Sequence, residues 1–401
     1  MASSEPLPVA GVRLAATSAG IKTEGRLDLV VMELAADSSI AATFTRNAFC
    51  AAPVHVAREH LARGAARYLL INTGNANAGT GEQGVSDARA CCRALAEAAG
   101  VEESAVLPFS TGVIGEALPV QQICEAIPAS LAGLAENNWW PAAEGIMTTD
   151  TRPKAASRQL ELDGRTITLS GMAKGAGMIR PNMATMLAYL ATDAAVAPAV
   201  LQTLWQEAVE QSFNRVTVDG DTSTNDAALL VASGAAGNSQ IDDTSHPDYP
   251  ALHEAVLALA LELAQALVRD GEGASKFVAV EVGGGRDEAE CLEVAYTIAH
   301  SPLVKTALFA SDPNWGRLLA AIGRADVYAL DVSLVEVRIN GVLIAEGGCR
   351  ASSYTEEQGV AAMEPGDISI AIDLQRGPAS ATVWTSDLSY DTVRINAEYR
   401  T

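Results

Sequence analysis

The sequence predicts a mixed α/β or α+β fold, and three observations carry this prediction. The chain of 401 residues is 49% hydrophobic, which is enough to bury one large core or two ordinary ones. Strand-like apolar runs are separated by segments with helical periodicity. Beyond residue 286 the pattern changes and strand-like runs dominate. We therefore expect a first domain over residues 1–285 and a second, smaller domain over residues 286–401.

The first domain is expected to begin with strands and a helix. Its apolar runs predict strands over 27–35, 67–72, 105–109 and 165–171. A helix is predicted from about Ser86, with Asp87 in its first turn. Gly100 suits the left-handed position that follows a helix.

Two further helices are expected in this domain. Proline is favoured at the first position of a helix, and Pro198 precedes apolar residues at helical spacing: Leu201, Leu204, Trp205, Ala208 and Val209. The apolar run 251–268 contains His253, Glu254 and Glu262, so it predicts a buried helix rather than a membrane span. Between these helices, 234–250 is rich in turn-forming residues and predicts a surface loop.

The second domain is expected to be mostly strands. The runs that predict them cover 291–299, 334–347, 367–377 and 380–386. Asn340 and Gly341 stand between two apolar runs, which is a strong signal for a hairpin turn.

The charge of the chain excludes several partners. The net charge is −22 and the sequence pI is near 4.6, so the attraction to phosphate that supplies most nucleic-acid affinity is missing. We expect no nucleic acid and no membrane surface as partner. An acidic substrate must be held by a few local cations, and the lysines are scarce: Lys22, Lys154, Lys174, Lys276 and Lys305.

The N-terminus and the cysteines indicate the compartment. The first residues, MASSEPLPVAGV, have neither the basic and apolar segments of a secretory signal nor an Arg-rich amphipathic face, so we expect a cytoplasmic protein. The six cysteines form no C-x-x-C pair, and we expect reduced thiols.

Three motif searches do not indicate a cofactor, a metal ion or a hydrolase triad. GTGEQG (79–84) has the glycine spacing of a dinucleotide site, but TGNANA separates it from the preceding strand, so a glycine-rich turn is the better interpretation. VDGDTSTND (218–226) resembles a calcium loop, but Thr224 and Leu230 occupy the positions that need glycine and glutamate; side chains bonding within their own turn fit better. The histidines form no H-E-x-x-H, and no G-x-S-x-G occurs. We expect no metal site.

Two other segments carry groups suited to acyl transfer. PFSTGVIG (108–115) places Thr111 beside Gly112, where a hydroxyl and a backbone N–H can together stabilise an oxyanion. In KGAGMIRPNMATM (174–186), the small residue Ala184 leaves its carbonyl open to the hydroxyl of Thr185. A threonine becomes a nucleophile when an amine acts as its base, and a cut before it frees such an amine. On residue chemistry alone, the favoured interpretations are a polar turn at 108–115 and the start of a strand at Thr185.

Several segments together resemble the ornithine acetyltransferase (glutamate N-acetyltransferase) family of arginine biosynthesis. They span nearly the whole chain: TGNANAGTGEQG (73–84), PFSTGVIG (108–115), KGAGMIRPNMATMLAYLATDA (174–194), TVDGDTSTND (217–226), SDPNWGR (311–317) and NAEYRT (396–401). The resemblance implies an αββα four-layer sandwich with a smaller C-terminal α/β domain.

The same resemblance implies a mechanism and its residues. The precursor is expected to cut itself between Ala184 and Thr185, giving an alpha chain 1–184 and a beta chain 185–401. Thr185 is then both the nucleophile and, through its freed amine, the base, while Thr111 and Gly112 form the oxyanion hole. The implied substrate-binding residues are Thr148, Lys174, Thr185, Glu272, Asn396 and Thr401.

The implied reaction is a ping-pong transfer of acetyl from N-acetylornithine to glutamate, with no bound cofactor. Two alpha and two beta chains are expected to form a heterotetramer. Whether acetyl-CoA also serves as donor stays open. Two rival interpretations also remain: a self-processing aminopeptidase or amidase of related fold, and a non-catalytic protein that uses GTGEQG.

Overall fold

The computed structural model describes residues 5–21, 23–64, 66–180 and 186–398, which form two compact units. The first unit contains the residues up to Asn214 together with Asp221–Leu267. The second contains Arg215–Gly220 and the residues from Val268 onward. Strand β11 (Phe277–Gly285) belongs to the second unit, although the sequence analysis assigned residues up to 285 to the first domain.

The first unit contains two β-sheets. One has the order β1 (Val12–Thr17), β2 (Leu29–Leu34), β4 (Tyr68–Asn75), β5 (Val106–Val113). The other has the order β3 (Ser39–Phe44), β10 (Ala227–Ala232), β8 (Leu187–Thr192), β7 (Arg165–Lys174), β6 (Lys154–Leu162). Neighbours are antiparallel except for the parallel pairs β4–β5 and β8–β10.

The two sheets pack face to face and share one core. Its residues come from both sheets, and include Met32, Ile71, Met172 and Leu229. Phe109 of β5 and Tyr189 of β8 meet edge to face, with ring centroids 5.4 Å apart. Because both faces of these sheets are covered, strands such as β8 are buried at every position and show no polar alternation.

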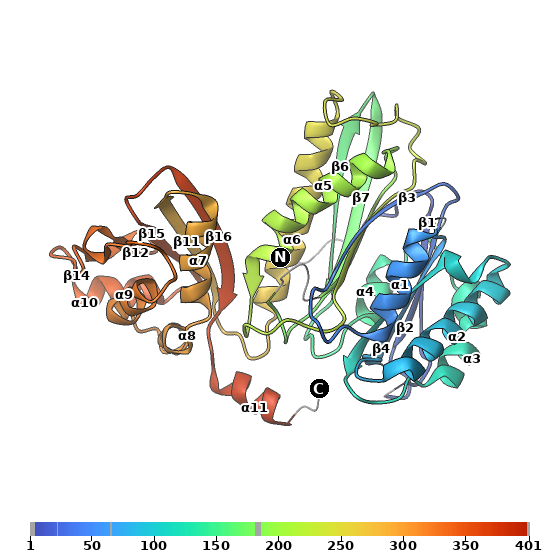
Figure 1. Ribbon diagram of the computed structural model, residues 1–401, viewed down its shortest axis with the longest axis horizontal. Helices are drawn as coiled ribbons and strands as arrows, with labels where there is room; N and C mark the ends of the chain where they lie inside the picture. The colour runs from blue at the N-terminus through green and yellow to red at the C-terminus, as the bar shows by residue number, and fades with distance from the viewer. Residues whose placement is uncertain (1–4, 22, 65, 181–185, 399–401) are drawn as a thin grey trace. The chain divides into compact units, whose positions relative to one another are not determined.

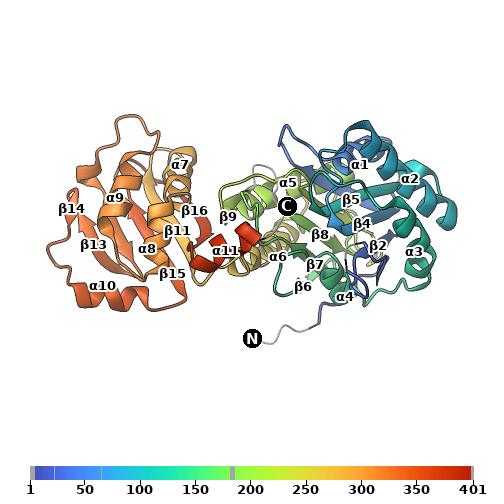
Figure 2. The same cartoon turned by 90° about the horizontal axis from the view of Figure 1, so that it is seen from below.

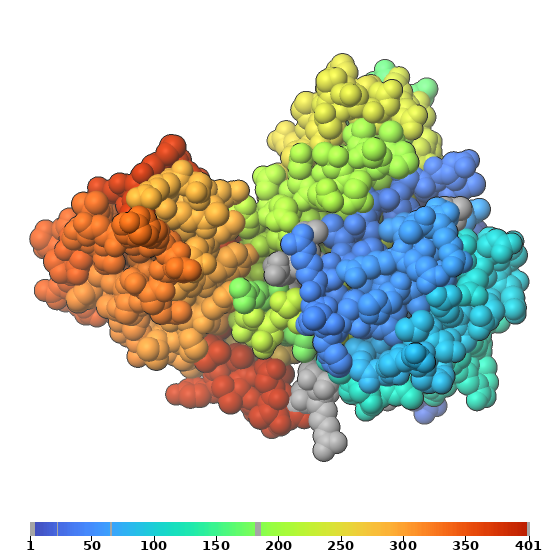
Figure 3. Space-filling model, viewed as in Figure 1, coloured from blue at the N-terminus to red at the C-terminus, as the bar shows by residue number. Residues whose placement is uncertain are grey.

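Helices cover the outer faces of both sheets. Helices α1 (Ala52–Ala62), α2 (Gly81–Ala99) and α3 (Val120–Ala132) cover the first sheet, where they share a core with β2, β4 and β5 (Figures 1 and 2). Figure 3 shows this helical layer in blue and cyan. Helices α5 (Pro198–Gln211) and α6 (Tyr249–Arg269) cover the second sheet, and Trp205 donates from Nε1 to the carbonyl of Ala228 at 2.9 Å. This confirms the predicted αββα sandwich, and α4 (Trp139–Gly145) packs beside β1 and β7.

Helix α6 is long and apolar enough to cross a membrane by length and composition, and 44% of its most apolar window is buried inside the structure. Its buried residues lie along one face, which packs on β7: a Cβ added to Gly171 would lie 3.0 Å from Cδ1 of Leu263. The predicted helix is present, but it is buried along one face only, whereas a buried helix was expected.

The second unit is built on one mixed sheet. Its order is β14 (Cys349–Arg350), β13 (Val342–Glu346), β12 (Glu336–Ile339), β15 (Asp367–Asp373), β11, β16 (Ala379–Ser386), β9 (Val216–Thr217). Helix α7 (Glu288–Ala299) packs on β11 and β16, and α8 (Pro302–Phe309) and α9 (Trp315–Gly323) adjoin it. Helix α10 (Glu356–Met363) packs near β12 and β13, and α11 (Tyr390–Glu398) buries none of its residues.

Most expected elements are confirmed, but several predictions were wrong. The second domain was expected to be mostly strands, whereas its helices α7 to α11 contain more residues than its strands. Residues 291–299 form the body of α7, not a strand: Asp287 caps the helix by accepting from the N–H of Glu290 at 2.9 Å, and the buried residues recur at helical spacing. Helix α2 begins at Gly81 rather than near Ser86. The hairpin at Asn340-Gly341, the helix start at Pro198 and the six free thiols agree with the sequence analysis.

Candidate active site

Three segments of the first unit bring the predicted polar residues together. Thr111 and Gly112 lie near the end of β5, and Lys174 is the last residue of β7. Thr148 lies in the loop between α4 and β6. The polar turn expected at 108–115 is wrong in part, because β5 continues through Val113 and places Thr111 on a strand.

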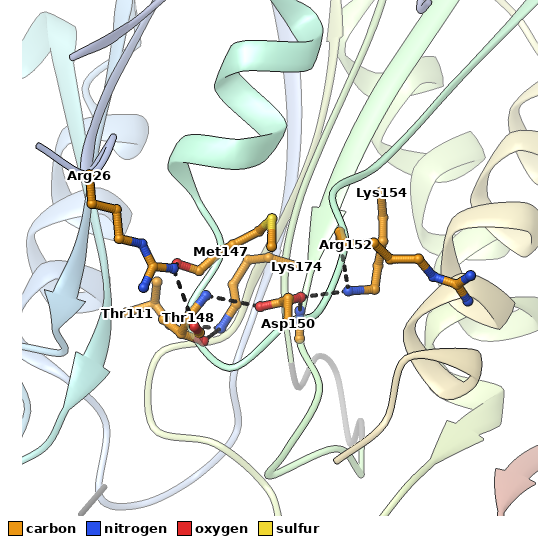
Figure 4. Close-up of polar contacts among 9 residues, drawn as sticks. Arg26, Thr111, Met147, Thr148, Asp150, Arg152, Lys154 and Lys174 are labelled. Carbon is orange, nitrogen blue, oxygen red and sulfur yellow. Dashed lines mark hydrogen bonds and ion pairs between the residues drawn. The ribbon is translucent and has the colours of Figure 1, made fainter. Parts of the chain in front are cut away.

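The ammonium of Lys174 joins the two threonines. Its Nζ atom donates to Oγ1 of Thr148 at 2.8 Å and to Oγ1 of Thr111 at 3.0 Å (Figure 4). Lys174 is 8% exposed and Thr111 is 9% exposed, so these bonds are shielded from water. Because the Thr111 oxygen accepts from a cation, its own proton is available for a further bond.

Asp150 supplies the negative charge of this cluster, and no sequence motif indicates it. Its carboxylate accepts from the N–H of Thr148 at 3.0 Å, the N–H of Gly175 at 2.8 Å and Nζ of Lys154 at 2.6 Å. Burial raises the pKa of Asp150, but the charges of Lys174 and Lys154 and these hydrogen bonds outweigh it and lower the pKa to about 2. Asp150 is therefore ionised at neutral pH, and it fixes the loop that carries Thr148.

A second cation lies beside the same loop. Arg26 donates from Nη2 to the carbonyl of Met147 at 2.6 Å and to that of Thr148 at 3.2 Å (Figure 4). No sequence motif indicates Arg26, which is far from Thr148 along the chain. Together with Lys174 it makes this part of a strongly acidic chain locally favourable for a carboxylate substrate.

Gly112 cannot be replaced by a larger residue without moving β4. Its φ is +140°, and a Cβ built on it would lie 2.3 Å from the carbonyl carbon of Gly74 and 2.5 Å from the nitrogen of Asn75. The parallel strands β4 and β5 pair here with Gly74 opposite Gly112. The glycine is thus required by close backbone approach.

The segment 218–226 also contacts this region. Part of it bonds within its own turn, as expected: the N–H of Asn225 donates to Oγ of Ser223 at 3.2 Å. The side chain of Asn225, however, donates to the carbonyls of Ala76 at 2.6 Å and Ser110 at 2.9 Å, so it ties the turn to β5. Among the described residues, no group of three or more His, Cys, Asp or Glu side chains is arranged to hold a metal ion.

In GTGEQG (79–84), Gly79 and Thr80 precede α2, and Gly81–Gly84 form its first turn. Gly79 and Gly81 have φ of +70° and +60°, and three residues separate the end of β4 from Gly79. The expected glycine-rich turn is therefore confirmed only at the start of the motif. The tight strand-to-helix turn of a dinucleotide site is not formed here.

Glu272 and Asn396 belong to the second unit, where their segments are neighbours. Glu272 is half-buried in the turn after α6, and Asn396 is exposed on α11. Ser389 donates to the carbonyl of Gly273 at 2.7 Å, and a Cβ on Gly273 would lie 2.3 Å from the nitrogen of Thr392. Ala184, Thr185 and Thr401 lie outside the described residues.

Comparison with known proteins shows the family to which this chain belongs. The model of the ArgJ family matches residues 13–401. The arginine biosynthesis bifunctional protein ArgJ of Pseudomonas syringae pv. tomato is 60% identical, over 98% of this chain and 97% of its own. The protein of the same name from Pseudomonas fluorescens is 58% identical over the same shares. The crystal structure of arginine biosynthesis bifunctional protein argJ from Bacillus halodurans is 36% identical with a TM-score of 0.50, over 52% of this chain and 96% of its own.

Proposed function

Because this chain belongs to the ArgJ family, an acetyltransferase family of arginine biosynthesis, we propose that it transfers acetyl from N2-acetyl-L-ornithine to L-glutamate through an ester on Thr185. The observation that carries the site assignment is the bond from Lys174 to Thr111. This bond places the candidate oxyanion-hole residue Thr111 beside the Lys174 ammonium, which can bind a substrate carboxylate, at the end of β7. The next strand, β8, begins at Leu187, two residues after Thr185.

The chain first cuts itself between Ala184 and Thr185. The chains produced have 184 and 217 residues. The Bacillus halodurans relative supports a cut, because almost the whole of its solved chain matches only 52% of this one. The amine freed on Thr185, with a pKa near ~8 when unperturbed, takes the proton of the Thr185 hydroxyl.

Acetyl transfer then proceeds in two half-reactions. The Thr185 oxygen attacks the acetyl carbonyl of N-acetylornithine, ornithine leaves, and the amine of glutamate attacks the resulting ester. In both tetrahedral intermediates the oxyanion accepts from the hydroxyl of Thr111 and the N–H of Gly112. The Lys174 ammonium orients that hydroxyl and offers its charge to the substrate carboxylate.

The remaining assignments complete the proposal. Glu272 binds the side-chain ammonium of ornithine, and Thr148, Asn396 and Thr401 line the substrate site. The Pseudomonas relatives are named bifunctional, which supports acetyl-CoA as a second donor. We assign the enzyme to the cytoplasm, as a heterotetramer of two alpha and two beta chains without a bound cofactor.

The test is an isotope assay. Purified enzyme receives N-acetylornithine labelled in the acetyl group, with or without glutamate. Label that appears in N-acetylglutamate supports the proposal. Label released only as acetate, at a rate that glutamate does not change, assigns the chain to a hydrolase and contradicts the proposal.

A further inference from the structure

A cavity between strand β6 and helices α4 and α6 has no role in the mechanism above. Its volume is about 330 Å³, and it is lined by Trp140 of α4, by residues 152–156 and by residues of α6 that include Glu262 and Leu263. Cavities that bind small molecules have volumes of about 300–1,000 Å³, so this one is large enough for a small ligand. Its lining contains none of the residues that we assign to catalysis or to substrate binding.

The cavity lies at the free edge of the second sheet. Strand β6 is the last strand in the order of that sheet, so no strand of the described residues pairs with its outer side. Thr168 of β7 directs its backbone toward the end of β8, because its carbonyl accepts from the N–H of Asp193 at 3.3 Å and its N–H donates to the Asp193 carboxylate at 2.8 Å. Its partner in β6, Gln159, therefore stands at a position where β6 and β7 exchange no hydrogen bonds.

The same alternation leaves the backbone of Ala155 facing outward. Hydrogen-bonded and non-bonded positions alternate along an antiparallel pair, and Ala155 lies four residues before Gln159 in an unbroken register. Its N–H and C=O thus point away from β7, and within the described part of the chain neither forms a hydrogen bond. At the next outward position, the carbonyl of Ser157 accepts from Nη1 of Arg158 at 3.0 Å. Ala155 therefore offers one donor and one acceptor to a ligand in the cavity.

The charged groups around Ala155 favour an anion. The carboxylate of Glu262 is paired with Arg158. The ammonium of Lys154 is paired with Asp150 at 2.6 Å. Arg152 adds a further positive charge to the lining, and its side chain extends away from Asp150 (Figure 4). A guanidinium has five N–H donors in a planar fork, so it can bind a ligand carboxylate in addition to its other partners.

The walls of the cavity are largely apolar. The indole of Trp140, the ring of Pro153 and the side chain of Leu263 line it, together with small alanine side chains. Contact with these walls stabilises a ligand that carries a short apolar body. The cavity therefore combines an apolar wall, a cation and an outward-facing backbone N–H and C=O.

We propose that this cavity is a second binding site, which takes an N-acylated amino acid with an apolar side chain. The ligand N–H donates to the carbonyl of Ala155, as in an antiparallel strand pair. One carboxylate oxygen accepts from the N–H of Ala155, and the other accepts from Arg152. The acyl group matters because a free amine carries a positive charge beside Arg152, whereas an acylated nitrogen keeps the donor without the charge. The side chain packs on Trp140 and Leu263.

The test uses N-acetyl-L-leucine as the probe, titrated into the purified protein and followed by ligand-observed NMR. A ligand of this size is expected to bind with a Kd of roughly 1 mM. Two analogues each lack one recognised group: N-acetyl-L-leucinamide lacks the carboxylate, and isocaproate lacks the acylated nitrogen. Each analogue should bind at least ~10-fold more weakly than the probe, because its hydrogen-bond partner in the cavity is left without the bond.

The first variant removes the backbone donor. Ala155→Pro deletes the outward N–H and keeps the ladder to β7, since an edge strand tolerates proline at an outward position. Gln159→Pro is the matched control, because its N–H also points outward but lies outside the cavity. Binding of the probe should weaken at least ~10-fold in Ala155→Pro. It should not change in Gln159→Pro, nor in Lys174→Met, which alters the candidate active site.

A second variant separates recognition from folding. Arg152→Met should weaken binding of N-acetyl-L-leucine at least ~10-fold and leave the affinity for N-acetyl-L-leucinamide unchanged, because only the acid uses the guanidinium. A folding defect would instead lower both affinities. Thermal unfolding of Ala155→Pro and Gln159→Pro is compared in the same way.

Four results overturn the inference. They are no saturable binding of N-acetyl-L-leucine, equal weakening in Ala155→Pro and Gln159→Pro, equal weakening of acid and amide in Arg152→Met, and binding that is lost in Lys174→Met but kept in Ala155→Pro. The last result would place the probe in the candidate active site. Failure of the proposed function is distinguishable, because this titration measures binding and requires no acetyl transfer.

Discussion

Lys174 at the end of β7 and Thr111 near the end of β5 are joined by a hydrogen bond of 3.0 Å between Nζ and Oγ1. The bond crosses from one sheet of the sandwich to the other, since β5 and β7 belong to different sheets. It holds the hydroxyl that we assign to the oxyanion hole and places a positive charge beside it.

Replacing Lys174 by Met should impair both binding and chemistry. The side chain keeps its volume but loses the charge offered to the substrate carboxylate and the donor that orients Thr111. We expect a higher KM for N-acetylornithine and a kcat lower by ~10²-fold, measured by steady-state kinetics. Thr148→Val removes only one acceptor of Lys174 and should have a smaller effect. An unchanged kcat in Lys174→Met would show that Thr111 does not depend on it.

The Thr111 hydroxyl can be tested by shape-conserving substitutions. Thr111→Val keeps the branched side chain and removes the donor, so kcat should fall by ~10²–10³-fold with little change in KM. Thr111→Ser keeps the hydroxyl and should retain most of the activity. Equal losses of kcat in Thr111→Val and Thr111→Ser would indicate that the packing of the side chain, rather than its hydroxyl, is needed for activity.

The sequence predicts much of the fold because local chemistry determines many elements. Asn340-Gly341 adopts positive φ at both residues, 44° and 85°, and only such residues make that turn easily. Residues 291–299 were misassigned because β-branched and aromatic residues favour strands, whereas the cap at Asp287 and packing on β11 and β16 make them helical.

The candidate site is only partly predictable, for a different reason. Lys174 and Thr111 stand in recognisable motifs, but Asp150 and Asp226 owe their properties to burial. Their pKa values are displaced in opposite directions, because Asp150 has two lysines and backbone donors around it while desolvation dominates at Asp226. These surroundings are assembled from distant parts of the chain, so no local pattern indicates them.

The close approach of β4 and β5 predicts that Gly112→Ala is severe. A Cβ at this position meets backbone atoms of Gly74 and Asn75, which cannot turn away as a side chain can. Gly115→Ala is the matched control, because Gly115 also has a positive φ, +84°, but no atom within 4 Å of the added Cβ. Activity of Gly112→Ala should fall by ~10²-fold or more, while Gly115→Ala bears only the backbone strain. Similar losses of activity in Gly112→Ala and Gly115→Ala would contradict the clash with β4 as the cause.

Asp150 should make the fold sensitive to acid. Its pKa is about 2 in the folded protein and 3.8 ordinarily, so between these values the unfolded chain binds more protons and stability falls as the pH falls. The free energy of unfolding should drop by about 2 kcal/mol from this group between pH 5 and pH 2. Urea unfolding across that range measures it.

Asp150→Asn tests the same group at neutral pH. The variant removes the carboxylate that pairs with Lys154, whose side chain is 2% exposed, and removal of one partner from a buried pair costs about 3–5 kcal/mol. The difference in free energy of unfolding between the variant and the wild type should become smaller below pH 4. If this difference in free energy does not change with pH, the charge of Asp150 is not the cause of the lost stability.

Intact mass of the purified protein, before and after incubation with N-acetylornithine, tests the central claim most directly. We predict two chains of 184 and 217 residues, with one acetyl group gained by the chain that begins at Thr185 and lost again when glutamate is added. A single chain of 401 residues that gains no acetyl group would contradict both the self-cleavage and the role of Thr185 as nucleophile.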